Sequence, residues 1–223
     1  PFGDKEVDRT NRKILNYVLS ALKNRFGSTN ESGIFSMEAS GLQEISNPAG
    51  LFLEERSNDA SGSVVCACLE GNRPILVEVQ ALVAKTPYGM PRRTAVGFDY
   101  NRVTMLLAIL ERRLGMDFGA YDAYVNVVGG MRVTEPAADL AVAAALVSSY
   151  RNRPIPHGVL VMGEVGLTGE VRRIGSPERR IKDAMNLGFK RFIVPAGKLS
   201  ADKLSAEVIQ VKSLDEALQY IFI

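Results

Sequence analysis

The sequence predicts a mixed α/β fold of the α+β sandwich type, and three observations support this. Strand-like segments follow one another at residues 63–69, 75–84 and 93–98. After residue 100, helical segments alternate with short apolar strands. Hydrophobic residues make up 46% of the chain and charged residues 23%, the usual composition of a globular domain. Because the strands come first in a block, the order excludes a regular doubly wound sheet.

The first element that the pattern predicts is a helix over residues 11–22. Ile14, Val18 and Leu22 recur there at the spacing that places side chains on one helical face. A stretch rich in turn-forming residues follows and ends this element.

The next segments indicate a boundary between two regions. Residues 33–37 and 41–45 predict a short hairpin. The run 54–62 is small and polar, as expected of a linker. We therefore expect residues 1–60 to form one region and residues 61–223 to form a domain.

The domain is expected to begin with the three strands named above. A strong helix should follow over residues 101–114, ended by Gly115. Its apolar stripe consists of Val103, Leu106, Leu107, Leu110 and Leu114.

Helices and strands then alternate to the end of the chain. An alanine-rich helix is expected over residues 136–150, with proline in its first turn. Another is expected over residues 177–187, capped by Ser176 and ended by Gly188. The remaining expected elements are strands at 123–128, 159–162, 170–174, 192–194 and 208–211, and a helix at 214–220.

Composition narrows the classes of function. The net charge is only +2, but two segments are basic. Residues 85–113 carry six basic and two acidic side chains, and residues 151–191 carry nine basic and four acidic side chains. Such clusters are typical of surfaces that bind nucleic acid and also of solvated helix faces.

The longest apolar runs, residues 103–110 and 140–147, are too short to cross a bilayer, so no membrane partner is expected. The chain begins without methionine or an apolar leader, so we expect a cytoplasmic fragment or processed product.

Cysteine and histidine content argues against a metal site and a disulfide scaffold. Cys66 and Cys68 should share one face of a strand as small buried residues. A structural zinc ion needs about four ligands, and His157 is the one histidine. That residue sits in a loop between a proline and a glycine, a poor place for a catalytic triad.

Nucleotide-binding motifs are missing from the chain. Gly197 and Lys198 are followed by Leu199 and lack the earlier glycine of a phosphate loop. No glycine-rich dinucleotide fingerprint is present either. We therefore expect no cofactor in this chain and no ATPase activity from it alone.

The most informative stretch runs from residue 125 to residue 195. It contains Gly129-Gly130, then Glu135-Pro136-Ala137-Ala138-Asp139, then Gly163-Glu164-Val165-Gly166, and finally Ile174-Gly175-Ser176-Pro177-Glu178-Arg179-Arg180. This stretch resembles the proteolytic domain of the Lon protease family, which implies a fold like that of ribosomal protein S5 domain 2. In the family, Gly-Pro-Ser-Ala-Gly carries the nucleophilic serine and Ile-Gly-Gly-Leu-Lys-Glu-Lys ends on the general base. By resemblance, these positions are Ala137 and Arg180 here.

Both replacements remove the chemistry of a serine–lysine dyad. Ala137 has no oxygen with which to attack, and Arg180 stays protonated and cannot accept the proton. Its place in the old dyad suggests a recessed site, in which Arg180 pairs with Glu135 or Asp139. A relocated dyad remains an alternative; its candidate residues are Ser148, Ser149, Ser176 and Lys182.

Further motifs resemble the bacterial RadA/Sms DNA-repair family. These are Lys23-Asn24-Arg25-Phe26-Gly27, Asn126-Val127-Val128-Gly129-Gly130 and Glu135-Pro136-Ala137-Ala138-Asp139-Leu140-Ala141. The resemblance implies that residues 1–60 are the end of a RecA-like ATPase region and that residues 61–223 are a Lon-like pseudo-protease domain. By this resemblance, Lys23 and Arg25 are expected to take part in the ATP- and DNA-linked functions of the family. Two cations on a turn can reach phosphate groups.

The resemblance also implies properties of a longer parent protein. That protein would be a DNA-dependent ATPase that assembles as a hexameric ring and drives branch migration, with a RecA-type recombinase as a further partner. ATP, magnesium and zinc would bind its missing N-terminal regions.

Three functions remain open for this chain. The first is an inactive scaffold that assembles rings and offers a basic surface to single-stranded or branched DNA. The second is a Lon-type serine peptidase with a relocated dyad, and the third is a pure oligomerisation module. The candidate DNA-contacting residues are Lys85, Arg92, Arg93, Arg112, Arg113, Arg172, Arg173, Arg179 and Lys182.

Overall fold

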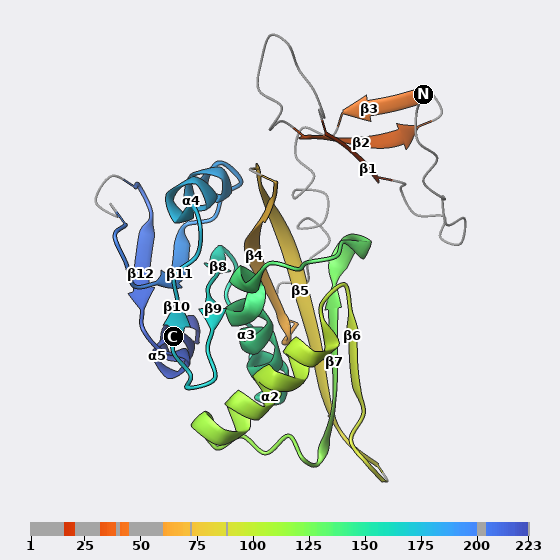
Figure 1. Cartoon of the computed structure of the whole chain (residues 1–223), viewed down its shortest axis with the longest axis vertical. Helices are drawn as coiled ribbons and strands as arrows, with labels where there is room; N and C mark the ends of the chain where they lie inside the picture. Colours follow the sequence, from red (N-terminus) through yellow and green to blue (C-terminus); the bar gives the residue numbers. More distant parts are fainter. Residues whose placement is uncertain are drawn as a thin grey trace. The chain divides into compact units, whose positions relative to one another are not determined.

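The computed structural model describes residues 16–20, 32–38, 41–44, 60–71, 73–87, 89–199 and 204–222 (Figure 1). The chain divides into two compact units. The N-terminal unit comprises Pro1–Pro48 with Gly71–Arg73, and the main unit comprises Ala49–Glu70 with Pro74–Ile223.

The N-terminal unit contains a three-stranded antiparallel sheet of β1 (Asn16–Ser20), β2 (Ser32–Glu38) and β3 (Gly41–Glu44). The predicted hairpin is therefore confirmed as the pairing of β2 with β3. The predicted helix over residues 11–22 is wrong at 16–20, where β1 pairs with β2 along its whole length. Backbone pairing with a distant strand outweighs the local helical spacing there. The basic motif Lys23 to Gly27 lies outside the described residues.

The main unit is built on a seven-stranded sheet in the order β12-β11-β8-β4-β5-β7-β6. β12 pairs parallel with β11, β11 with β8, β8 with β4, and β6 with β7, whereas β5 and β7 are antiparallel. A separate two-stranded ribbon consists of β9 (Glu164–Val165) and β10 (Val171–Arg172). The sheet strands are β4 (Ser63–Glu70), β5 (Arg73–Lys85), β6 (Arg93–Val96), β7 (Tyr121–Val127), β8 (Val159–Val161), β11 (Arg191–Pro195) and β12 (Glu207–Val211).

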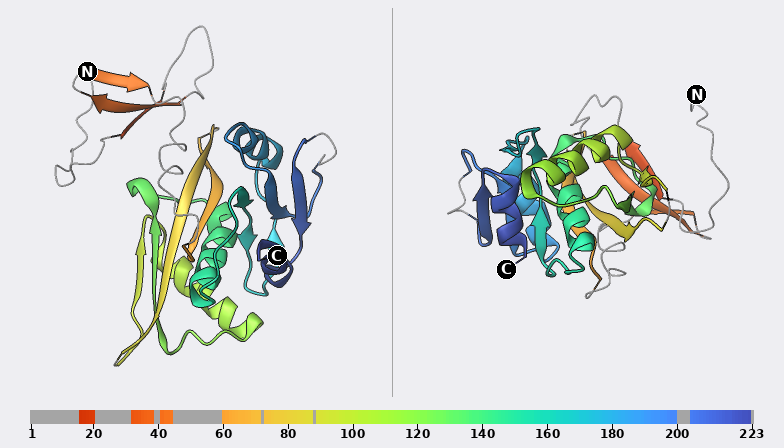
Figure 2. Two further views of the ribbon diagram at one scale, coloured as in Figure 1. Left: turned by 180° about the vertical axis from the view of Figure 1, so that it is seen from behind. Right: turned by 90° about the horizontal axis from the view of Figure 1, so that it is seen from below.

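Helices cover both faces of this sheet, which confirms the predicted mixed α/β class (Figure 2). α2 (Tyr100–Leu114), α3 (Asp139–Tyr150) and α5 (Leu214–Ile221) pack on one face. α4 (Pro177–Asn186) packs on the other face, against β4, β8 and β11. Alternate residues of β4 serve the two cores: Val64 and Cys66 face one, and Val65 and Ala67 face the other.

The ends of α2 follow the predicted signals. The Asp99 carboxylate accepts a hydrogen bond from the Arg102 amide at 2.8 Å and caps the helix start. Gly115 ends α2 in the left-handed conformation (φ 65°), which glycine adopts without strain. Among the described residues, no helix is long and apolar enough to cross a membrane.

Two predicted helix starts differ from the structure. The helix expected from residue 136 begins with a 3₁₀ turn, η2 (Pro136–Ala138), and becomes α-helical at Asp139. Ser176 precedes α4 but does not cap it with its side chain. Side-chain capping needs extended backbone at that position, whereas Ser176 is left-handed, with φ 52° and ψ 47°.

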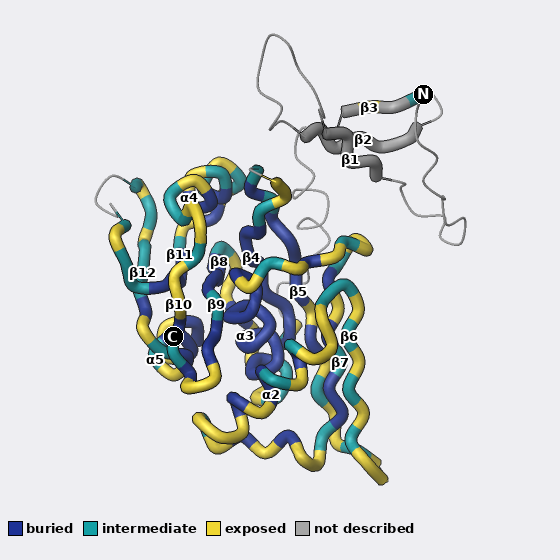
Figure 3. The backbone as a smooth tube through the Cα atoms, viewed as in Figure 1, coloured by how far each residue is buried: buried dark blue, intermediate teal, exposed yellow. Residues whose placement is uncertain are grey.

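α3 is buried along nearly its whole length (Figure 3). It is apolar on all sides, as expected of a helix enclosed within a core. Its many alanines allow the sheet and the neighbouring helices to approach its backbone closely. This rigid helix holds the η2 turn and the candidate site at its N-terminal end.

Candidate functional site

The candidate site surrounds η2, where the Lon-type nucleophile position falls. Ala137 is buried, and its carbonyl oxygen accepts a hydrogen bond from the Gly163 amide at 2.8 Å. The Leu140 amide returns a hydrogen bond of 3.0 Å to the Gly163 carbonyl. The turn is thus fixed to the segment before β9, and a methyl group lies where a nucleophile would lie.

Arg180, which the resemblance assigns to the position of the general base, is fully buried. Its guanidinium forms a two-pronged ion pair with Glu135, in which Nη1 donates to Oε2 at 2.9 Å and Nη2 donates to Oε1. Nη1 also donates to the Ala67 carbonyl at 2.6 Å, and Nε donates to the Gly175 carbonyl at 2.8 Å. The guanidinium therefore ties α4 to β4 and to η2. The sequence predicted a recessed Arg180 paired with Glu135 or Asp139; the structure shows a buried Arg180 paired with Glu135.

Glu135 has a further partner, because its Oε2 accepts a hydrogen bond of 2.7 Å from the Leu69 amide. The carboxylate therefore joins the start of η2 to both β4 and α4. Such a network is strong because its hydrogen bonds join charged groups, and Oε2 accepts from two donors.

A second arginine holds the other end of the turn. Asp139 is buried at the first residue of α3, and it forms a two-pronged ion pair with Arg102 of α2. The Arg102 Nε lies 2.8 Å from Asp139 Oδ1, and the Val165 amide donates to Oδ2 at 3.0 Å. Burial raises the pKa of Asp139, while these hydrogen bonds and the arginine charge oppose that increase.

Sequence reasoning missed Arg102 and named Asp139 only as a possible partner of Arg180. The sequence did contain a signal for this pair, namely a carboxylate at the start of an otherwise apolar helix. A buried carboxylate needs a cation or hydrogen-bond donors beside it. The two ion pairs together hold residues 135–139 at both ends. By the Lon resemblance this would be the dyad site, with Ala137 at the nucleophile position and Arg180 at the base position.

The relocated-dyad candidates lie apart from this site or are otherwise engaged. The Ser148 hydroxyl donates to the Arg153 carbonyl at 2.6 Å and accepts from the Gly62 amide at 2.8 Å. The Ser149 hydroxyl accepts from the Val83 amide at 2.8 Å. Ser176 and Lys182 are both exposed, but they are six positions apart and do not share a helical face.

The two cysteines lie on one face of β4, as predicted, and both are buried. Their sulfur atoms are 3.6 Å apart. The hydrogen bond with Cys68 and burial raise the pKa of the Cys66 thiol well above its usual value, so it stays protonated. Within the described ranges, no three His, Cys, Asp or Glu side chains are grouped so that they could hold a metal ion.

The basic candidates occupy several surfaces of the main unit. Lys85, Arg92, Arg112, Arg113, Arg172, Arg173, Arg179 and Lys182 are exposed. The Arg92 amide is anchored to Asp122 at 2.8 Å, which leaves its side chain exposed. Arg172 pairs with Glu170 at 2.6 Å.

Arg93 differs from the other candidates because it has a structural role. Its guanidinium donates to the Phe118 carbonyl at 2.7 Å and to the Tyr121 carbonyl. It therefore fastens the turn before β7 to β6 and has less freedom to contact a ligand.

A protein-family model supplies the classification. The model described as "Subunit ChlI of Mg-chelatase" matches residues 80–198, more than half of the chain. This chain belongs to that family. The matched range includes Ala137 and Arg180.

Curated relatives carry the name "DNA repair protein RadA". The chain is 52% identical over 205 residues to the protein from Halalkalibacterium halodurans, which covers 91% of this chain and 45% of the relative. It is 51% identical over 204 residues to that of Bacillus subtilis, covering 91% and 44%. It is 50% identical over 206 residues to that of Pseudomonas aeruginosa, covering 92% and 46%. The predicted resemblance to the RadA family is confirmed, and the chain spans less than half the length of these relatives.

Proposed function

We propose that this chain is the proteolytically inactive, Lon-like scaffold part of a DNA-repair ATPase. The relatives named DNA repair protein RadA support the role in DNA repair. The longer protein would use ATP and magnesium, would bind zinc, and would drive branch migration beside a RecA-type recombinase. This chain would support ring assembly and offer a basic surface to DNA in the cytoplasm.

The observation that carries the proposal is the buried position of Arg180. An active dyad needs a neutral amine beside a hydroxyl. Here a permanently charged guanidinium is bound to Glu135 and to two carbonyl oxygens, next to an alanine. These contacts give Arg180 a structural role, which supports a scaffold over a peptidase.

The direct test is incubation of the chain with unfolded casein and fluorogenic peptides. We expect no cleavage by the natural sequence. The variant Ala137→Ser/Arg180→Lys should also stay inactive, because Glu135 would hold the new lysine in its charged form. Cleavage by the natural chain that disappears in Ser176→Ala or Lys182→Gln would establish the relocated dyad instead.

Binding to DNA is expected to depend on phosphate contacts by exposed cations. Arg112 and Arg113 stand in the last turn of α2, and both side chains are exposed. Log–log plots of affinity against salt should have a slope of roughly −0.7 to −0.9 per phosphate neutralised. The pair Arg112→Gln/Arg113→Gln should reduce both affinity and slope, whereas the charge-matched pair Lys190→Gln/Lys212→Gln should change them less. No DNA binding by the natural chain at low salt would favour the pure oligomerisation module.

Ring assembly follows from the resemblance and from the preference of oligomers for closed symmetry. We expect self-association into a closed ring, with six subunits as in the RadA/Sms family. Sedimentation at increasing protein concentration tests this, and a monomer at every concentration would contradict it.

A further inference from the structure

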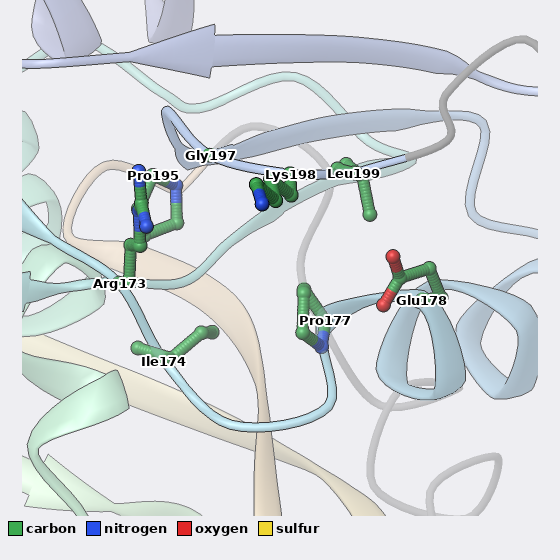
Figure 4. A pocket seen from close by; sticks show the side chains of 8 residues that line it. All are labelled: Arg173, Ile174, Pro177, Glu178, Pro195, Gly197, Lys198 and Leu199. Atoms are coloured by element: carbon green, nitrogen blue, oxygen red, sulfur yellow. The ribbon is translucent and has the colours of Figure 1, made fainter.

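A small pocket opens beside the start of α4, outside the old dyad site (Figure 4). Its volume is about 170 Å³. The segment after β10, the first turn of α4 and the turn after β11 form its walls. A site holding one water needs roughly 10–15 Å³ by the same kind of measure, so the pocket has room for a small polyatomic group.

Two cations and one carboxylate line this pocket. The cations are Arg173 and Lys198, and the carboxylate is Glu178. Neither cation forms an ion pair with a carboxylate among the described residues. The described residues that line the pocket therefore carry a net positive charge, and no ion pair among the described residues neutralises either cation.

The backbone around the pocket holds Arg173 against the turn after β11. Its Nε donates a long hydrogen bond of 3.4 Å to the Ala196 carbonyl, which leaves its terminal nitrogens available. Gly197 permits this, since a Cβ there would lie 3.1 Å from Arg173 Nε. The Gly197 amide donates to Gln210 Oε1 at 2.8 Å and fixes the turn to β12.

The rest of the wall strengthens the attraction to an anion. Ile174, Pro195 and Leu199 contribute apolar surface. Charges beside such surface interact more strongly than in open water, because the effective dielectric constant is lower. Arginine and lysine together suit a phosphate, whose oxygens accept several hydrogen bonds.

We propose that the pocket between Arg173 and Lys198 binds one phosphate group of the DNA backbone. This inference rests on the proposed function and adds a specific contact to it. Lys198 becomes a DNA-contacting residue that the charge pattern of the sequence did not indicate. The contact is independent of base identity, because it involves only the phosphate.

The test measures binding of a fluorescent oligothymidylate to the full chain at two salt concentrations. The variant Arg173→Gln/Lys198→Gln should bind several-fold more weakly at low salt, and its salt slope should fall by roughly 1. The matched control Lys190→Gln/Lys212→Gln removes two exposed cations outside the pocket. An equal loss in both double variants, or no loss in the first, would overturn the proposal.

Glu178 provides a test of opposite sign. Removing the one carboxylate that lines the pocket, with Glu178→Gln, should strengthen oligonucleotide binding several-fold, provided that the thermal melt shows a folded chain. The exposed acid Asp215 on α5 lies outside the pocket, and Asp215→Asn is the matched control. Weaker binding by Glu178→Gln would contradict an anion site.

Inorganic phosphate distinguishes the two sources of the ligand. Phosphate should compete with the oligonucleotide for the natural chain more than chloride of equal ionic strength does, and it should lose this advantage in Arg173→Gln/Lys198→Gln. Phosphate binding that depends on the pocket, together with unaltered DNA affinity, would assign the pocket to a free phosphate compound and overturn the DNA contact. If the natural chain binds no DNA, the DNA part of the proposed function fails as well. If the natural chain and the pocket variant bind DNA equally, only the pocket assignment fails.

Discussion

At the scale of single residues, the Arg180 guanidinium connects α4 to β4 and to the start of η2. Arg180 is buried, and its guanidinium donates to the Gly175 and Ala67 carbonyls and to the Glu135 carboxylate. Lysine cannot reproduce this set, because it lacks the planar two-pronged geometry. The arginine therefore strengthens the connection of α4 to β4.

Removing Arg180 should destabilise the fold. Arg180→Met leaves Glu135 and the Ala67 carbonyl without their cation, and breaking a buried pair in this way costs about 3 kcal/mol of unfolding free energy. Urea denaturation measures the change. The neighbouring exposed residue provides the control, and Arg179→Met should alter the free energy by less than about 0.5 kcal/mol. Equal stability of the two variants would show that the buried network contributes little.

The carboxylate of Glu170, in the turn between β9 and β10, makes a contribution to the stability of the fold that depends on pH. The Thr168 hydroxyl, a backbone amide and Arg172 lower the pKa of Glu170 to about 2, against an ordinary value of 4.5. A lowered pKa means that the charged carboxylate stabilises the fold above pH 4.5, and that this contribution disappears as the pH falls toward 2.

Glu170→Gln should therefore melt at a lower temperature than the natural chain at neutral pH. The difference in melting temperature should shrink between pH 4.5 and pH 2, where Glu170 gains its proton. Thermal melts followed by circular dichroism check this. As a control, Glu207→Gln removes an exposed carboxylate on β12, whose pair with Arg191 is long at 3.4 Å, and should show a smaller difference. If the difference in melting temperature between Glu170→Gln and the natural chain stays constant down to pH 2, the charge of Glu170 is not its cause.

At the scale of elements, α3 supports both the core and the candidate site. Ala143, Ala144 and Leu146 are fully buried. Small residues allow close approach of the neighbours, and the larger ones fill the space that remains. Displacement of this helix would move Asp139 away from Arg102.

A cavity in the core beside α3 should lower the unfolding free energy. Leu146→Ala is expected to lower the unfolding free energy by about 3 kcal/mol, because the surrounding core can collapse only in part. Leu167→Ala makes the same chemical change at a leucine that is 66% exposed, and it should cost far less. Denaturant titration compares them. Similar losses in the two variants would mean that α3 packs loosely.

At the scale of the whole molecule, the described hydrophobic clusters belong to the main unit. One lies between the sheet and α2, α3 and α5, and the other lies under α4. We expect a fragment of residues 49–223 to unfold in one cooperative transition, with a melting temperature within about 4 °C of the full chain. Calorimetry of both chains tests this. A broad transition without cooperativity would show that the N-terminal unit is needed for the fold.

Much of the fold was predictable from local sequence. α2 was expected over residues 101–114 and spans Tyr100–Leu114, because its apolar stripe and Gly115 are both local signals. Sequence motifs also assign Ala137 and Arg180 to the positions of a Lon-type dyad, and this assignment stays a prediction. Periodicity misled at Asn16–Ser20, where a strand forms because a partner strand is present.

The sequence by itself determined the fold class and most elements, since these depend on residue identity and short-range spacing. The tertiary structure alone revealed the Arg102–Asp139 pair, whose members are 37 positions apart, and the convergence of Arg173 with Lys198. It also decided between Glu135 and Asp139 as the partner of Arg180. Such contacts depend on the order of strands in the sheet and on helix packing across it, and local spacing carries no information about either.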